Sequence, residues 1–370
     1  MLEWKLIRLG DICLTNKSSY SSKDNWKFVN YLDTGSLTEN KITELQYINI
    51  EMDKMPSRAR RKVIKNSILY STVRPNQLHY GIIKEPVDNL LVSTGFTVID
   101  VDTNKAIPEF IYYLLTQNNT TEQLQAIAEQ SVSTYPSIKP SDIENLEFKL
   151  PNLIIQSKIV SILDTIDSKI RQNEKINNNL EQQTQAIYSR MFIEHRQESW
   201  STGQLSDLIS VKYGKDHKKL ADGNYPVYGS GGIIRYVEKP LHTGESVLIP
   251  RKGTLNNVIY VNEAFWSVDT MFYTEMLHPN IAKFVYHFVK SKDLASLNAG
   301  SAVPSMTTNI LNAMQLYIPD EKTLEKFENI VSPMYSAMQE NTKESKILAN
   351  TRDTLLPKLM SGELDVSDID

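Results

Sequence analysis

The chain has 370 residues, of which 41% are hydrophobic and 23% are charged, and its formal net charge is −4. These values are typical of a globular protein with two or three domains. No apolar run approaches the roughly 18 residues of a membrane span, the first residues lack a signal-peptide core, and the single cysteine, Cys13, excludes an internal disulfide and a thiolate metal site. We therefore expect a cytoplasmic protein.

The net charge hides an uneven distribution. From Lys54 to Lys84 the sequence carries eight lysines and arginines and no acidic residue, whereas 320–370 carries six basic and eleven acidic residues, a balance of 6 − 11 = −5. A basic stretch of this kind is the electrostatic signature of a DNA-binding face. An ordinary solvated surface is the alternative interpretation.

The elements predicted before residue 151 are mostly strands. Asn66–Pro75 is rich in branched side chains and predicts a strand, Ile107–Gln117 predicts an amphipathic helix, and Asp142–Pro151 predicts a short helix that runs into a strand. We therefore predict that 1–150 forms an α/β (α+β) domain rich in β structure.

A long helix is predicted next, within the segment 151–198. Neither glycine nor proline occurs from Asn152 to Gln197, and apolar residues recur at steps of three and four. A helix over 155–195 would be roughly 60 Å long at about 1.5 Å per residue, which exceeds the diameter of a small domain. The predicted seam residues are Ile159, Ile162, Ile166, Leu180 and Ile187, with a polar interruption at Asn173.

The second half of the chain repeats the first. Trp4 and Trp200 open the similar segments "WKLIRLGDI" and "WSTGQLSDLI", 196 residues apart, and Pro136–Pro151 resembles Pro304–Pro319 at a shift of 168. The second copy is therefore about 28 residues shorter, with the loss in its variable middle. The repeat predicts a second β-rich domain, 199–319, with a strand in Glu245–Gly253 and a helix in Pro279–Ser291, and then a second long helix and tail, 320–370.

The second helix has the same periodicity and the same polar interruption. A single polar residue in an apolar seam fixes register and partner choice. We therefore predict that the two helices form an antiparallel coiled coil with pseudo-twofold symmetry, with one domain at each end. The predicted seam residues of the second helix are Phe327, Met334, Met338, Asn341, Leu348 and Leu355.

Three glycines fall within Gly229–Gly232, in the stretch "YPVYGSGGIIRYVEK". A dinucleotide-binding loop would lead into a helix, but "IIRYVEK" alternates as a strand does, so a tight turn between strands is predicted. The six histidines lack metal-ligand spacing, and no P-loop, G-x-S-x-G or amino-methyltransferase motif is present. The sequence therefore predicts no metal site and no catalytic residues.

Several phrases resemble the specificity subunit of type I restriction–modification systems, over nearly the whole chain. They are "YPVYGSGGIIRYV", "SVLIPRKGT" and "FWSVDTMFY" in the second unit, "PSIKPSDIENLEFKLPNLIIQSKIVSILDTIDSKI" at the end of the first, and the terminal "RDTLLPKLMSGELDV". The resemblance implies two tandem target-recognition domains, each followed by a conserved long helix. The first domain lacks the glycine-rich turn, so the two would be different subtypes that read different half-sites.

The resemblance also implies a function without catalysis. Each recognition domain would bind one half of an asymmetric, bipartite site in double-stranded DNA, and the coiled coil would set the unread gap. A single chain would dock two methyltransferase subunits, which use S-adenosylmethionine to methylate adenine, and motor–nuclease subunits, which use ATP and Mg²⁺. This chain would hold no cofactor itself.

The candidate DNA contacts are polar and basic residues of the two domains. Lysine and arginine on phosphates set position, whereas hydrogen-bonding side chains on base edges read sequence. Arg235 and Asn256 stand where small residues are expected. The candidates in the first domain are Arg58, Arg60, Arg61, Lys62, Arg74, Asn76, Gln77, Ser133 and Tyr135; those in the second are Lys212, Tyr228, Ser230, Arg235, Arg251, Lys252, Thr254, Asn256, Ser301 and Ser305.

Two alternatives remain open from the sequence. A coiled-coil scaffold whose β-domains do not recognise DNA predicts binding that is independent of DNA sequence. A self-contained DNA methyltransferase with unrecognised motifs predicts methyl transfer by the purified chain alone.

Overall fold

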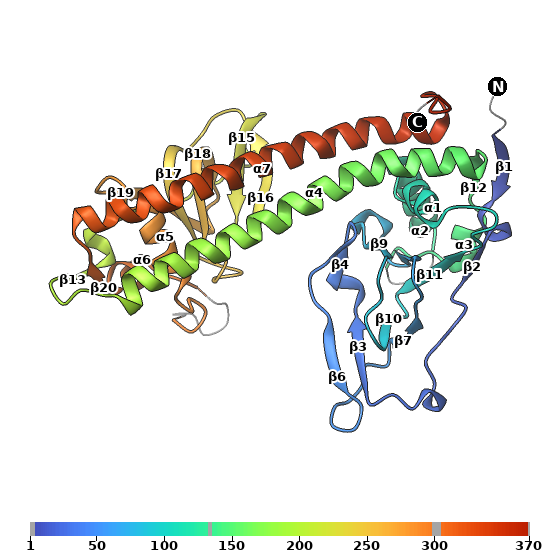
Figure 1. Ribbon diagram of the computed structural model, residues 1–370, viewed down its shortest axis with the longest axis horizontal. Coiled ribbons are helices and arrows are strands. Elements are labelled where there is room, and N and C mark those ends of the chain that lie inside the picture. The colour runs from blue at the N-terminus through green and yellow to red at the C-terminus, as the bar shows by residue number, and fades with distance from the viewer. Residues whose placement is uncertain (1–3, 132–134, 298–304, 369–370) are drawn as a thin grey trace. The chain divides into compact units, whose positions relative to one another are not determined.

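The computed structural model describes residues 4–131, 135–297 and 305–368. The chain divides into two compact units, which we call unit 1 (Met1–Arg171 with Glu344–Asp370) and unit 2 (Gln172–Lys343) (Figure 1). Each unit therefore combines one predicted domain with part of both long helices. No helix in the described part of the chain is both long enough and apolar enough to cross a membrane.

Unit 1 is built on two four-stranded sheets. One has the order β6 (Gln46–Asn49), β3 (Phe28–Leu32), β10 (Leu90–Ser93), β7 (Ala59–Lys62), and the other has the order β2 (Cys13–Thr15), β11 (Phe96–Val101), β8 (Ser67–Ser71), β9 (Tyr80–Ile83). Strands β3 and β10 are parallel, and the other neighbours are antiparallel. Two short pairs complete the strands, β1 (Lys5–Arg8) with β12 (Glu147–Leu150) and β4 (Leu37–Thr38) with β5 (Lys41–Ile42).

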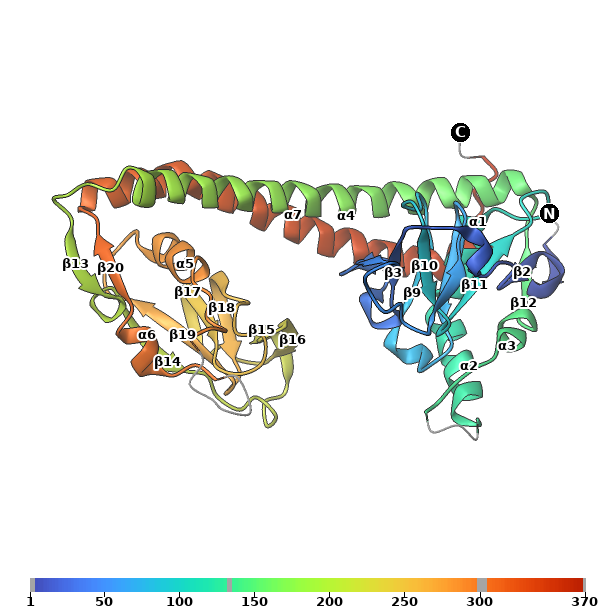
Figure 2. The ribbon, with the colours of Figure 1, turned by 90° about the horizontal axis from the view of Figure 1, so that it is seen from below.

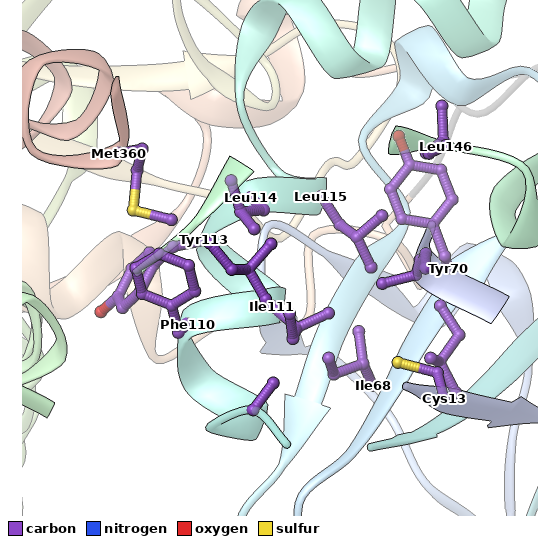
Figure 3. Close-up of a cluster of buried hydrophobic side chains, with 14 of the residues drawn as sticks. Cys13, Ile68, Tyr70, Phe110, Ile111, Tyr113, Leu114, Leu115, Leu146 and Met360 are labelled. Carbon is purple, nitrogen blue, oxygen red and sulfur yellow. The ribbon is translucent and has the colours of Figure 1, made fainter. Parts of the chain in front are cut away.

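Three short helices, α1 (Pro108–Leu115), α2 (Asn118–Glu129) and α3 (Pro140–Glu144), cover part of unit 1. Pro108 opens α1, where its missing N–H is not needed. Figure 3 shows the apolar side of α1, with Phe110 and Ile111, in the same cluster as Ile68 of β8 and Met360 of the C-terminal helix. The predicted strand and helices of this domain are confirmed.

Unit 2 has one six-stranded sheet in place of two sheets. Its order is β14 (Ile209–Tyr213), β19 (Met271–Met276), β17 (His242–Pro250), β18 (Ile259–Ser267), β15 (Asp222–Gly229), β16 (Gly232–Val237). Its remaining elements are the pair β13 (Ser201–Gln204) with β20 (Gln315–Ile318) and the helices α5 (Ala282–Lys290) and α6 (Thr308–Asn312). Figure 2 shows α5 between the sheet and the long helices.

The structure confirms the predicted repeat. Strands β2 and β14 begin at Cys13 and Ile209, 196 residues apart, whereas α3 and α6 begin at Pro140 and Thr308, 168 apart. The parallel pair β3–β10 recurs as β15–β18. The long strands β17 and β18 take the places of β7–β8 and β9–β10, which joins the two sheets into one. The β4–β5 hairpin and the segment before β7 account for much of the extra length of unit 1.

The long helices are α4 (Leu153–Tyr188), which ends in a π-helical segment (Ser189–Glu194), and α7 (Glu321–Ser361). They run antiparallel, as predicted. In unit 1 an oxygen of Asp167 lies 2.8 Å from a guanidinium nitrogen of Arg352, and in unit 2 Asn173 Nδ2 donates to the carbonyl of Asn341 at 3.3 Å. The two polar interruptions therefore meet each other.

Most of the predicted seam is enclosed, with one departure. Ile159, Phe327 and Asn173 are fully buried, whereas the remaining predicted seam residues are half-buried. Ile176, which continues the apolar periodicity, is 39% exposed. Asn177 takes its place against α7 and donates to the carbonyl of Met338 at 3.2 Å. The contact between the two helices is therefore polar near Asn173 and Asn177. The apolar pattern alone wrongly places Ile176, and not Asn177, at this contact.

Each domain rests on the long helices through a repeated polar contact. In unit 1 the hydroxyl of Tyr113 on α1 donates to Asp167 at 2.7 Å. The matching helix α5 places His287 against the hydroxyl of Tyr335 at 3.0 Å, and Tyr335 stands 168 residues after Asp167. Burial lowers the pKa of His287 to about 4, so its imidazole is neutral at physiological pH. The same contact thus involves a carboxylate in unit 1 and two neutral side chains in unit 2.

Candidate nucleic-acid interface

In unit 1 several loops meet where the parallel strands β3 and β10 end. The backbone N–H of Thr94 donates to the carbonyl of Arg58 at 2.9 Å, and that of Thr72 donates to the carbonyl of Gly95 at 2.8 Å. Gly95 packs closely on this turn, since a Cβ there would lie 2.6 Å from Thr34 Oγ1 and would displace that side chain. We call this surface edge 1. It comprises Asp33–Ser36, Arg58, Thr72–Gln77, Ser93–Gly95 and Tyr135–Ser137.

Arg74 is the best-placed cation of edge 1. Its backbone is left-handed (φ 49°), and its N–H donates to the carbonyl of Pro136 at 2.9 Å. The guanidinium carbon lies 4.8 Å from the centre of the Tyr135 ring, which is 56% exposed. A cation–π contact of this kind restrains the guanidinium group beside the ring. Asn76 and Gln77 follow it, both exposed, on a short 3₁₀ turn (Pro75–Gln77).

Unit 2 repeats this construction at what we call edge 2. The N–H of Arg251 donates to the carbonyl of Thr270 at 2.9 Å, and the N–H of Met306 donates to the carbonyl of Arg251 at 2.9 Å. Lys252 forms an isolated antiparallel β-bridge with Ser305, as Val73 does with Ser137 in unit 1. Edge 2 comprises Tyr213, Gly229–Gly232, Arg251–Asn257, Ser267–Thr270 and Ser305–Met306.

An arginine stacked on a tyrosine occurs at edge 2 as well. The guanidinium carbon of Arg251 lies 5.4 Å from the centre of the Tyr213 ring, and its Nη1 donates to the carbonyl of Asp269 at 3.4 Å. The tyrosines come from different places in the two units, Tyr135 from the loop before α3 and Tyr213 from the end of β14. The two edges therefore share a framework but present different side chains.

The glycine-rich stretch is a tight turn between antiparallel strands, as predicted. Gly229 of β15 pairs with Gly232 of β16, and Gly232 has a φ of +112°, which favours glycine. The carbonyl of Ser230 accepts a hydrogen bond from Asn257 Nδ2 at 2.7 Å. Gly253 (φ +84°) leaves room for Ser230, since a Cβ there would lie 2.8 Å from Ser230 Oγ. The turn is thereby fixed against the Arg251–Asn257 loop.

Unit 1 lacks a glycine-rich turn at the matching place, as the sequence predicts, and has a different turn there. Because β3 corresponds to β15, the segment "DTGS" (Asp33–Ser36) occupies the place of "GSGG" (Gly229–Gly232). It is a 3₁₀ turn with one glycine and leads into the β4–β5 hairpin. The β4–β5 insertion also changes the spacing, so the two turns do not align in the sequence.

Three candidates of unit 2 already have partners within the protein. Tyr228 is buried and its hydroxyl donates to Glu263 at 2.6 Å; burial and this carboxylate raise its pKa, so the phenol stays neutral. Arg235 bonds to Asp222 at 2.8 Å and to the carbonyl of Leu220. Asn256 bonds to Asp293 and to the N–H of Ala295, both at 3.0 Å. These three side chains help to hold their own loops in place, and their proposed contacts with DNA stay predictions.

Other candidates differ in availability. Lys62 is paired with Asp24 and lies over the Trp26 ring, Arg61 is half-buried, and Lys212 pairs with Glu275 at 3.4 Å. Ser133 and Ser301 lie outside the described residues. The exposed candidates are Arg58, Arg60, Asn76, Gln77, Tyr135, Lys252, Thr254 and Asn256, and those half-buried like Arg61 are Arg74, Ser230, Arg251 and Ser305. Thr34 and Tyr213 were not among the candidates, because only the fold brings them to edge 1 and edge 2.

The described residues of the two edges show no candidate catalytic or metal site. Within the described ranges, no group of three or more histidine, cysteine, aspartate or glutamate side chains is arranged to hold a metal ion. Cys13 is buried, and burial raises the pKa of its thiol to about 12, so it is not a nucleophile. The edges offer fixed cations and hydrogen-bonding groups, which suits recognition of a polyanion.

Comparison with known families decides the assignment. The family model described as the type I restriction modification DNA specificity domain matches residues 1–182 and, a second time, residues 197–348. The chain belongs to this family. Each match covers one β-rich domain and much of the long helix that follows it, so the repeat is a duplication of the specificity domain. The predicted non-catalytic, DNA-specificity class is confirmed by this membership.

Individual relatives are distant but cover the whole length. The specificity subunit of the type I restriction enzyme HindI from Haemophilus influenzae is 23% identical over 483 residues, covering 98% of this chain and 100% of that protein. The MjaIX specificity subunit from Methanocaldococcus jannaschii is 20% identical over 414 residues, covering 99% and 94%. The crystal structure of a type I S subunit from M. genitalium has a TM-score of 0.60 at 19% identity, covering 99% of this chain and 97% of that one. This similarity supports the fold.

Proposed function

We propose that the chain is the DNA-recognition subunit of a type I restriction–modification complex, in which edge 1 and edge 2 each bind one half of an asymmetric bipartite site. The observation that carries the proposal is the repeated edge, with Arg74 stacked on Tyr135 in unit 1 and Arg251 stacked on Tyr213 in unit 2. A planar guanidinium held by stacking is suited to bidentate contact with guanine or phosphate. Because the surrounding side chains differ, the two half-sites differ in sequence.

In the same proposal the chain supplies recognition and its partners supply chemistry. Two methyltransferase subunits that use S-adenosylmethionine would dock on one copy of this chain and methylate adenine in each half-site. Motor–nuclease subunits that use ATP and Mg²⁺ would join this assembly. The long helices would set the gap between the half-sites.

The direct test is to map adenine methylation in cells that express this chain with its methyltransferase. The expected result is a two-part motif with a fixed gap, which disappears when this chain is omitted. No motif from a folded, associated complex would favour the scaffold alternative, and methyl transfer by this chain alone would favour the enzyme alternative.

Replacing Arg251 with alanine is expected to weaken binding to the cognate duplex by about 1–3 kcal/mol if the guanidinium reads a base. The measurement is a titration of the methyltransferase complex with cognate and scrambled duplexes at two salt concentrations. The matched control is Lys322→Ala, which removes an exposed cation on α7 outside edge 2. It should change the affinity for neither duplex. An equal loss on both duplexes, with a shallower salt dependence, would instead identify Arg251 as a phosphate contact.

A further inference from the structure

The tip of the β15–β16 hairpin carries two exposed isoleucines that the proposed contacts do not use. Ile233 is 49% exposed and Ile234 is 58% exposed. They lie at a β-bulge, because Tyr228 pairs with Ile233 and Val227 pairs with Arg235, which leaves Ile234 as the extra residue of the strand. Strand β16 lies at the margin of the sheet, next to β15 alone (Figure 2). A sheet margin normally presents polar side chains to water, so this apolar tip requires a reason.

The tip adjoins edge 2 and is held by contacts with it. Ile233 follows Gly232 directly and pairs with Tyr228, whose ring is anchored in the core. Ile234 lies against Gly229, because a Cβ on that glycine would be 2.6 Å from Ile234 Cδ1. The hydrogen bond from Asn257 to Ser230 ties the turn to the loop that carries Arg251 and Lys252. The turn that precedes the isoleucines is therefore joined to the loop that carries the cations.

The chemistry of the tip narrows what it can recognise. An isoleucine side chain offers no hydrogen bond, so it cannot distinguish the donors and acceptors of base edges. The one aliphatic group that a base pair exposes in the major groove is the 5-methyl of thymine, and that groove admits a two-stranded β-ribbon. Nearby Arg251 and Lys252 supply the positive charge that a groove flanked by phosphates attracts.

We propose that the β15–β16 tip enters the major groove and that Ile233 and Ile234 recognise thymine methyl groups in the half-site bound by unit 2. This inference rests on the proposed function and specifies part of its target: at least one thymine that is read by contact with its methyl group. A pocket made only of polar side chains would read the same base through its O4 acceptor.

The test replaces thymine by deoxyuridine, which keeps the hydrogen bonds and removes only the methyl group. The methyltransferase complex of the full chain is titrated with cognate duplexes that carry a single deoxyuridine at each thymine in turn. The expected result is a loss of about three- to ten-fold in affinity at one or two positions of one half-site. The Ile233→Ala, Ile234→Ala double variant should bind both duplexes alike at those positions. Leu277→Ala, an equally exposed apolar residue at the far end of β19, should retain the wild-type pattern.

Each other outcome overturns the inference in a recognisable way. Tolerance of deoxyuridine at every position, or a loss of equal size in the double variant, would rule out methyl reading while leaving sequence-specific binding intact. Failure of the double variant to assemble with the methyltransferase would assign the tip to a protein contact. Equal affinity of the wild-type complex for cognate and scrambled duplexes would instead contradict the proposed function itself.

Discussion

Replacing Lys283 with methionine is expected to lower the unfolding free energy of unit 2 by about 3–5 kcal/mol, the usual cost of removing one partner from a buried ion pair. The side chain of Lys283 is 6% exposed, and its Nζ lies 2.9 Å from Glu245 and also contacts Glu328. The rings of Tyr260 and Tyr335 lie 5.4 and 5.6 Å away. Methionine fills a similar volume but leaves the two carboxylates without their cation.

The effect should depend on pH in a defined direction. Burial alone would raise the pKa of Glu245, but hydrogen bonds from Tyr260 and Lys283 outweigh it, so this pKa lies below its ordinary value. A carboxyl group with a depressed folded-state pKa stabilises the fold above its unfolded pKa, and this contribution is lost as the pH falls through the folded value. The difference between wild type and Lys283→Met should therefore be largest near pH 7 and should narrow under acidic conditions.

Lys290→Met is the matched control, because it makes the same change about two turns along the same helix. Lys290 pairs with Glu181, but both side chains are 38% exposed, so its loss should cost less than about 1 kcal/mol. Hydrogen exchange of α5 and β17 in the full chain measures the local stability of unit 2. Equal protection in the two variants would show that the Lys283 cluster does not hold α5 in place. Adding Glu245→Gln to Lys283→Met should restore part of the loss.

The sequence predicts what local pattern and repetition determine. The apolar periodicity of α4 and α7, the strand after Asn66 and the turn at Gly229–Gly232 depend on residues close in the chain. The repeat also predicts that the elements recur in the same order. The structure agrees, since α4 and α7 begin 168 residues apart, at Leu153 and Glu321. Local signals of this kind survive in a single sequence.

The side-chain partners could not be predicted, because folding supplies them from distant segments. Arg235 resembled a free DNA contact until Asp222 and the carbonyl of Leu220 were found beside it. Asn256 resembled a base reader, yet it joins its loop to Asp293. Polar residues at strand ends can either contact DNA or hold a loop in place. Their amino-acid type alone does not distinguish these two roles. The exposed isoleucines were overlooked for the opposite reason, since alternation with polar residues predicted a strand but not which face was covered.

Removing one heptad from both long helices is expected to abolish methylation at the original site, since a fixed gap between half-sites would no longer be matched. The segments 170–176 and 338–344 are suitable, because they are repeat-equivalent and Asn173 contacts Asn341. Seven residues are close to two helical turns, so the paired deletion keeps the seam facing its partner. Asp167 and Tyr335, which contact the domains, remain, as do their partners on the long helices, Arg352 and Thr184.

The paired deletion also has a constructive outcome that separates a ruler from a general defect. Seven residues at about 1.5 Å each shorten a helix by roughly 10 Å, and one turn of DNA is roughly 34 Å for about ten base pairs. The complex should therefore prefer the same two half-sites with a gap about three base pairs shorter, as mapped by adenine methylation in cells. Deleting 170–176 alone leaves Asn341 without its counterpart. This variant should methylate neither the motif with the original gap nor the motif with the shorter gap. An unchanged gap in the paired deletion would mean that the helices do not set the spacing, because recognition of each half-site would then be independent of the length of the chain that joins them.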